Sequence, residues 1–150
     1  MTKNNPTYIF KSISIESIDI DDQLTNFSFD IPPISLKQSI EEVGVIHPVT
    51  LVPLGKIFRI VCGHKRIKIV SQLKIKEIPA RILSPAPDEE AMLILNLSEN
   101  QFLHHYSDIE KGLILFKLSE ARVPEIRIIE KYMPMLGLEK SKKLLDDYLS

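Results

Sequence analysis

The chain has 150 residues and a mass of 17.2 kDa, with 44% hydrophobic residues, 26% charged residues and a formal net charge of −1. A nearly neutral chain this rich in Ile and Leu can bury a core, which excludes disorder over its whole length. The longest apolar run, residues 91–95, is far shorter than the ~20 residues that cross a bilayer. We expect no secretion signal, because residues 1–20 carry polar and acidic groups where an apolar segment would lie. Its one cysteine excludes a disulfide framework and a cysteine zinc cluster, so we expect a cytoplasmic protein without a membrane partner.

Charge is unevenly distributed along the chain. Residues 51–82 carry eight basic side chains and one acidic side chain, whereas residues 1–50 and 83–150 each carry an acidic excess. A basic block in a nearly neutral chain is typical of a footprint for an anionic partner. A solvated face on a strand–helix unit would give the same pattern, and both interpretations stay open at this point.

The first elements are predicted from alternation and capping signals. Apolar and polar residues alternate over residues 8–20, which predicts a half-buried strand with an irregularity near Ser17. Residues 35–38 (S-L-K-Q) have the pattern of a capping box, which predicts a short helix that ends at Gly44.

The central part of the chain is predicted to alternate strands with a helix. Strands over residues 48–53 and 57–62 flank a turn, which favours a hairpin. A helix is expected from His64 to about Leu73. Residues 78–83 then predict a short strand whose proline favours an edge position or a strand start.

The last third of the chain is predicted to be helical. One helix has the acidic residues 88–90 in its first turn, where carboxylates suit the positive end of the helix dipole, and it runs to about Phe102. A second capping box at residues 107–110 (S-D-I-E) opens the next helix, and two further helices follow Pro124. The fold class is therefore α+β: a small mixed sheet with packed helices, followed by an all-helical C-terminal segment. We place the boundary after residue 106.

The most informative stretch follows the strand over residues 57–62. Gly63 turns the chain, and the expected helix then begins with His64, Lys65 and Arg66. Cations are unfavourable at a helix N-terminus by about 0.3–1 kcal/mol each unless an anion lies beside them. A bound phosphate would reverse that penalty, and glycine would let it approach the backbone. The alternative is a surface helix whose basic residues fall early by chance.

A second candidate feature is the pair Glu99 and Asn100. A carboxylate beside an amide carbonyl offers two hard oxygen ligands, which suit Mg²⁺ held jointly with phosphates. A polar helix end without function is the plain alternative. Adjacent His104 and His105 have no further spaced ligands, so we do not predict a zinc site there.

Taken together, these segments resemble the N-terminal domain of the ParB family, in the ParB/sulfiredoxin superfamily, in collinear order over about residues 13–122. Residues 36–49 resemble the family pattern L-x-x-S-I-x-x-x-G-x-x-x-P-V, and residues 58–66 resemble I-V-x-G-E-R-R. Residues 78–82 resemble V-P-A-x-V, and residues 97–101 resemble x-x-E-N-x. Four ordered matches are much more specific than any single motif.

The resemblance implies a ParB-like nucleotide-binding domain over residues 1–106 that binds CTP with Mg²⁺. Gly63, His64, Lys65 and Arg66 would lie at the phosphates. Gly44, His47 and Pro48 would line the base end, and Glu99 and Asn100 would hold the metal. Such domains serve plasmid and chromosome partition or transcription regulation. The implied partners are DNA, a second copy of the chain and a partition ATPase, and the implied location is the nucleoid.

The sequence also departs from the family. His64 stands where the family's G-E-R-R pattern has glutamate, and Leu103 stands where its E-N-x-Q-R pattern has arginine. The missing arginine puts CTP hydrolysis in doubt, so at most a weak nucleotide triphosphatase is implied, with Glu99 as the candidate catalytic group. Two alternatives stay open: a phosphotransferase similar to the free-serine kinases of this superfamily, and a protein-interaction module with a vestigial pocket. Cys62 is interpreted as a core thiol rather than a nucleophile.

The helical segment over residues 107–150 has two interpretations. In the first interpretation, the segment is the start of a helix-turn-helix region, and Lys140, Lys142 and Lys143 face DNA phosphates. A small helical bundle or a dimer contact would fit the same apolar stripes, and Asp146 and Asp147 weaken the DNA interpretation. Whether the chain is a fragment of a longer protein stays open from the sequence.

Overall fold

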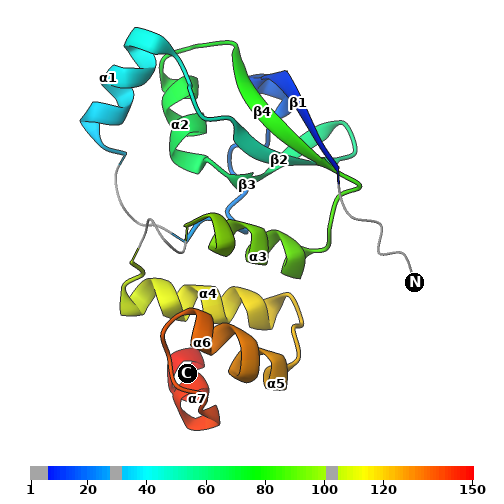
Figure 1. The fold of residues 1–150 in the computed structure, drawn as a ribbon, viewed down its shortest axis with the longest axis vertical. Coiled ribbons are helices and arrows are strands. Elements are labelled where there is room, and N and C mark those ends of the chain that lie inside the picture. The colour runs from blue at the N-terminus through cyan, green and yellow to red at the C-terminus, as the bar shows by residue number, and fades with distance from the viewer. Residues whose placement is uncertain (1–6, 28–31, 101–104) are drawn as a thin grey trace. The chain divides into compact units, whose positions relative to one another are not determined.

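The computed structural model describes residues 7–27, 32–100 and 105–150 (Figure 1). The first elements, in chain order, are β1 (Thr7–Ser14), the 3-10 turn η1 (Ile15–Ser17), α1 (Ile34–Val43), β2 (Val49–Leu54), β3 (Ile57–Cys62), α2 (His64–Gln72), β4 (Glu77–Ser84) and α3 (Glu89–Asn100). Those that follow are α4 (Asp108–Glu120), α5 (Glu125–Arg127), the π-helical turn η2 (Ile128–Tyr132), α6 (Met133–Met135) and α7 (Lys142–Leu149). The chain forms two compact units, and the division after Asn96 falls within α3. The predicted boundary after residue 106 concerns domains that fold separately, and it stays a prediction.

The first unit is built on a mixed sheet with the strand order β1-β4-β2-β3. β1 pairs antiparallel with β4, β2 pairs antiparallel with β3, and β2 pairs parallel with β4. The α+β prediction and the β2–β3 hairpin are therefore confirmed. The edge position suggested for residues 78–83 is wrong, because β4 lies inside the sheet. Pro79 is tolerated there because the parallel ladder with β2 begins only at Ala80, so no N–H is needed from Pro79 on that side.

Both faces of this sheet are covered. On one face, α1 and α2 pack over the larger core cluster, which includes Leu51, Ile60, Ile67 and Ile78. On the other face, Met92 of α3 joins a smaller cluster with Val52, Val61, Cys62 and Leu83. Cys62 is buried in this cluster, as a core thiol would be. The packing in these two clusters fixes the positions of α2 and of the first part of α3 against the sheet.

The second unit is helical and buries Ile114, Leu115, Leu118 and Tyr132. Its α4 packs against α7 and η2. Phe27 also belongs to this unit, and the ammonium of Lys117 lies 5.2 Å from the centre of the Phe27 ring. Within the part of the chain that the structure describes, no helix has the length and apolar character needed to span a membrane.

The two predicted capping boxes have different outcomes. At the start of α4, Ser107 Oγ accepts a hydrogen bond from the Glu110 N–H at 3.2 Å, and a Glu110 carboxylate oxygen accepts one from the Ser107 N–H at 2.9 Å. This reciprocal box is confirmed. The box predicted at residues 35–38 is wrong: the N-cap is Pro33, two residues before Ser35, and it makes no side-chain capping bond.

Candidate functional site

The turn from β3 into α2 requires glycine for two separate reasons. Gly63 has φ 104° and ψ 24°, in the left-handed region that other residues rarely adopt. A β-carbon at this position would also lie 2.5 Å from Val49 Cγ1 and 2.9 Å from Val49 Cβ. The backbone of the turn therefore packs directly against the first residue of β2, and the start of α2 lies close to the sheet.

The first turn of α2 has an unusual charge for a helix N-terminus. It holds half-buried His64, Lys65 and Arg66, it has no acidic residue, and Gly63 supplies no capping side chain. α3 in the same unit follows the ordinary pattern: it begins with Glu89 and Glu90, and Asp88 Oδ1 accepts the Ala91 N–H at 2.8 Å. The contrast that the sequence suggested is thus present in the structure, and the α2 N-terminus is suited to an anion.

Arg66 links α2 to the segment that precedes β2. Its Nη1 donates to the carbonyl oxygen of Pro48 at 3.0 Å and also to the carbonyl oxygen of His47. Gly44, with φ 76°, ends α1 just before this segment, and its N–H donates to the Ile40 carbonyl at 2.9 Å. The structure therefore brings Arg66 of α2 together with His47 and Pro48, which are 18–19 residues earlier in the chain.

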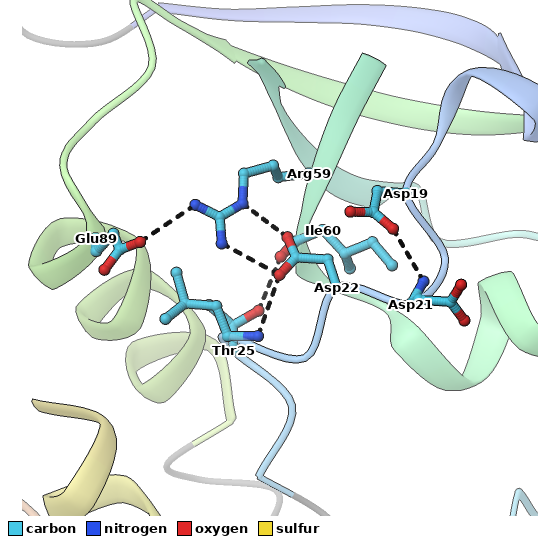
Figure 2. A network of polar contacts seen from close by, with 8 residues as sticks. Asp19, Asp21, Asp22, Thr25, Arg59, Ile60 and Glu89 are labelled. Carbon is cyan, nitrogen blue, oxygen red and sulfur yellow. Dashed lines mark hydrogen bonds and ion pairs between the residues drawn. The ribbon is translucent and has the colours of Figure 1, made fainter. Parts of the chain in front are cut away.

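A polar network anchors β3, directly before Gly63. Arg59 Nε donates to Asp22 Oδ2 at 2.8 Å and Arg59 Nη2 to Asp22 Oδ1 at 3.2 Å, while Arg59 Nη1 lies 3.5 Å from Glu89 Oε1. Figure 2 shows Arg59 between the two carboxylates. Nearby, Thr25 Oγ1 donates to the Ile60 carbonyl at 2.8 Å. The network ties the loop after η1 and the start of α3 to the strand that leads into α2.

Asp22 is ionised in this setting despite its burial, with its side chain 7% exposed. Burial by itself raises the pKa of Asp22, and the hydrogen bonds from Arg59 and from the Leu24 N–H lower it. The charges of Arg59 and His64 lower it further, so the pKa of Asp22 falls below its ordinary 3.8. Neither Asp22 nor Arg59 was identifiable from spacing, because 37 residues separate them.

The other predicted site residues lie in the second unit. Glu99, which is exposed, and Asn100, which is half-buried, form the last turn of α3. They are not among the residues that the first unit brings together. In residues 7–27, 32–100 and 105–150, no group of three or more His, Cys, Asp or Glu side chains is arranged to hold a metal ion. The predicted Phe102 helix end, the Leu103 departure and His104 lie outside the described residues.

The three lysines predicted to contact DNA are exposed, near or within α7. Lys140 Nζ lies 3.1 Å from Glu130 Oε2. Lys142 Nζ lies 3.1 Å from Glu125 Oε1 and 3.2 Å from Asp146 Oδ2, and its hydrogen bonds to these carboxylates raise its pKa above 10.5. Lys143 follows on the same helix. Two of the three lysines therefore already have carboxylate partners.

The comparison with protein families decides the identity of the first unit. The family model described as the ParB N-terminal domain matches residues 4–101 of the 150-residue chain. The chain belongs to the ParB N-terminal domain family. The resemblance inferred from the four ordered motifs is confirmed.

Curated ParB proteins match parts of the chain. A probable plasmid-partitioning protein ParB of Thermus thermophilus is 31% identical over 61 residues, which are 41% of this chain and 20% of that protein. A probable chromosome-partitioning protein ParB of Coxiella burnetii is 31% identical over 83 residues, which are 55% of this chain and 28% of that protein. The chain thus matches less than a third of the length of these ParB proteins.

Solved ParB structures have the same fold. A C-terminally truncated chromosome-partitioning protein ParB from Caulobacter crescentus, complexed with CTP-gamma-S, superposes with a TM-score of 0.55 at 21% identity and covers 88% of this chain and 73% of that one. The same ParB complexed to the centromeric parS site gives a TM-score of 0.53 at 18% identity, over 93% and 70% of the two chains. A Pnob8-like ParB-N domain gives 0.61 at 19% identity, over 88% and 51%.

Proposed function

We propose that this chain is the nucleotide-binding domain of a DNA-associated partition or transcription-regulatory protein, and that it binds CTP with Mg²⁺. The observation that supports this best is the basic first turn of α2, which follows a glycine that no other residue could replace without strain. A helix N-terminus with cationic side chains favours phosphate oxygens. The Caulobacter crescentus ParB with the same fold is complexed with a CTP analogue, which agrees with this assignment.

The residues present fit such a ligand. Gly63 lets the turn before α2 pack closely against Val49, and Lys65 and Arg66 add cationic side chains beside His64 at the phosphate end. Gly44, His47 and Pro48 form the base end. The resemblance assigns Mg²⁺ to Glu99 and Asn100, whose side chains offer the hard oxygen ligands that this ion prefers. The metal would neutralise phosphate charge in the bound state.

Titration calorimetry tests this proposal directly. We expect saturable heat for CTP with Mg²⁺ and much weaker heat for ATP with Mg²⁺ under the same conditions. Magnesium tripolyphosphate is the control for binding that depends on phosphate charge alone. Equal heats for CTP and ATP would contradict the assignment of the base, and an absence of heat with every nucleotide would contradict nucleotide binding.

Two alternative functions predict different experimental results. The G-H-K-R segment at residues 63–66 is also similar to the phosphotransferases of the superfamily, with Glu99 as the candidate catalytic group. That function predicts nucleotide-dependent phosphorylation of a small hydroxyl acceptor, abolished by Glu99→Gln. A vestigial pocket predicts no change in melting temperature with CTP, whereas a bound ligand raises it by mass action.

We also propose that the protein associates with DNA in the nucleoid and works as a homodimer with a partition ATPase. The support is the match to partition proteins and to a ParB structure complexed with the centromeric parS site. Lys140, Lys142 and Lys143 would contact phosphates in a helix-turn-helix region. Duplex binding measured against salt concentration tests the DNA part, since each lost phosphate contact lowers the slope of log K against log salt by about 0.9. An unchanged slope in Lys143→Ala would exclude Lys143 from the contact.

A further inference from the structure

We propose that the outer edge of β1 is a self-association surface, on which β1 of a second copy of the chain pairs antiparallel. The two four-stranded sheets then join into one continuous sheet, with Ile9 on the two-fold axis. This inference rests on the proposed function only in that it names a surface for the homodimer. It requires neither nucleotide nor DNA, so it is tested apart from them.

The two edge strands of the sheet, β1 and β3, are covered differently. On β3, the Phe58 carbonyl accepts the Asp19 N–H at 2.9 Å, and the Ile60 carbonyl accepts the Thr25 hydroxyl at 2.8 Å. The segment over residues 18–25 thus supplies donors to the outer edge of β3. Within residues 7–27, 32–100 and 105–150, no further strand lies beyond β1. An edge of this kind is a template for another strand.

β1 also lacks the usual features that keep an edge strand from pairing. Such strands are typically short, interrupted by a bulge or proline, or rich in charge. β1 has eight residues, pairs with β4 in unbroken register and carries one charged residue, Lys11. Three large apolar side chains on it are exposed, Tyr8 by 41%, Ile9 by 56% and Phe10 by 70%. Pairing with another strand would bury them.

The ladder between β1 and β4 determines which backbone groups of β1 face outward. The Ile15 N–H donates to the Lys76 carbonyl at 2.9 Å, and Ser12 lies opposite Pro79, which has no N–H to donate. Because hydrogen-bonded pairs alternate along an antiparallel ladder, the odd-numbered residues of β1 bond to β4. The even-numbered residues of β1 therefore present their N–H and C=O groups to the outer edge.

A second copy of the chain fits this edge because β1 is complementary to itself. In the pairing centred on Ile9, Tyr8 faces Phe10 of the second copy and Ile9 faces its own counterpart, so each exposed apolar side chain meets another. The Tyr8–Phe10 pairs use the outward even-numbered positions, and each such pair exchanges two hydrogen bonds. Lys11 faces Thr7 of the second copy. The two Lys11 residues are then about 14 Å apart, so like charges do not meet.

Arg81 orders one of the aromatic rings before association. Its guanidinium carbon lies 5.3 Å from the centre of the Tyr8 ring, and its Nη2 donates to Thr50 Oγ1 at 2.7 Å. Thr50 is buried in the sheet, so Arg81 is held in place from below. A ring that is already ordered loses less conformational entropy when it becomes part of an interface.

Sedimentation equilibrium without nucleotide or DNA tests the association. One pair of strands buries less than a standard interface of about 1,600 Å², so we expect a reversible dimer with a dissociation constant in the micromolar range. Phe10→Lys removes both aromatic pairs and should weaken the dimer at least about tenfold. Leu54→Lys is the matched control. Leu54 is 53% exposed in β2, on the far side of β4 from β1, and its replacement should leave the dimer unchanged.

Two results would overturn the inference in different ways. A wild-type chain that stays monomeric up to about 1 mM would show that β1 does not pair with itself, and would leave its edge to an extended segment of another protein. A dimer that Phe10→Lys leaves unchanged would place the homodimer contact elsewhere, and the proposed homodimer would then stand without this surface.

Disulfide cross-linking tests the register of the pairing. Directly opposed residues of a non-hydrogen-bonded pair have α-carbons about 4.5 Å apart, within the range that a disulfide spans. Ile9→Cys should therefore form a covalent dimer when oxidised glutathione is added. Lys11→Cys is the control, because Lys11 is also exposed on β1 but lies far from its counterpart, and Cys62 is buried in both variants. Equal cross-linking of the two variants would contradict the pairing centred on Ile9.

Discussion

Gly63 lies so close to Val49 that a β-carbon on Gly63 would be 2.5 Å from Val49 Cγ1. The contact joins the first residue of β2 to the turn that opens α2. Because Val49 is fully buried in the larger core cluster, it has no room to move aside. The position of the α2 N-terminus is therefore set by the core of the first unit.

Gly63→Ala should destabilise the protein by about 3 kcal/mol, through left-handed backbone strain and overpacking against Val49. Gly55→Ala is the matched control, because Gly55 has φ 61° but nothing within 4 Å of its missing β-carbon. That variant should cost only about 1 kcal/mol. Urea denaturation measures both, and equal costs would show that the contact with Val49 is not restrictive.

Asp22→Asn should lower the free energy of unfolding at neutral pH by about 1–3 kcal/mol, because it removes the charged partner of a largely buried guanidinium. The pKa of Asp22 is depressed in the folded state, so its contribution is present above the ordinary pKa of 3.8 and is lost as the pH falls through the lower folded value. The difference between wild type and variant should therefore shrink below about pH 4.

The control for this prediction is Asp21→Asn, since Asp21 is the exposed neighbour in the same loop. Its effect should stay within about 0.5 kcal/mol. Denaturation curves from pH 3 to pH 7 compare the two variants. A pH-independent difference for Asp22→Asn would contradict the ion pair with Arg59.

Ser107→Ala should destabilise the second unit by about 1 kcal/mol, because it removes the hydroxyl that accepts the Glu110 N–H at the start of α4. The reciprocal bond, from the Ser107 N–H to the Glu110 carboxylate, loses its partner in the capping box. Ser35→Ala is the comparison. Ser35 is exposed and lies inside α1 rather than at its N-cap, so its loss should cost no more than about 0.5 kcal/mol. A larger effect at Ser35 than at Ser107 would be inconsistent with these helix starts.

These two serines illustrate what local sequence predicts and what it leaves open. Both precede Gln or Glu by three residues, but only Ser107 caps a helix. α1 already begins at Ile34, directly after Pro33, so Ser35 is incorporated into the helix. Local signals also identified the hairpin and the start of α2, because a turn or a glycine stands at each of those boundaries.

Pairings between distant segments were not accessible from the sequence. The central place of β4 depends on parallel pairing with β2, which leaves no local signature. The Asp22–Arg59 pair joins residues 37 positions apart. Arg66 was identified as a site residue from its place after Gly63. Its acceptors, however, are backbone carbonyls, and these are available at every residue and therefore cannot be predicted by type.

Lys65→Glu should weaken CTP binding by about tenfold or more, since it reverses a charge in the first turn of α2. Lys68→Glu is the matched control on the same helix, one turn further along and exposed to solvent. Its effect should stay within about threefold, because exposed charges at that distance are screened. Similar losses in both variants, measured by calorimetry, would indicate a diffuse charge effect rather than a site at the helix start.

The most direct test of the account is an NMR titration of the ¹⁵N-labelled chain with CTP and Mg²⁺, followed at the backbone amides. The account predicts saturable shifts that are largest at residues 63–66, with smaller shifts at residues 44–49. Saturating CTP that leaves the amides of residues 63–66 unmoved would contradict the claim that a phosphate group binds at the start of α2.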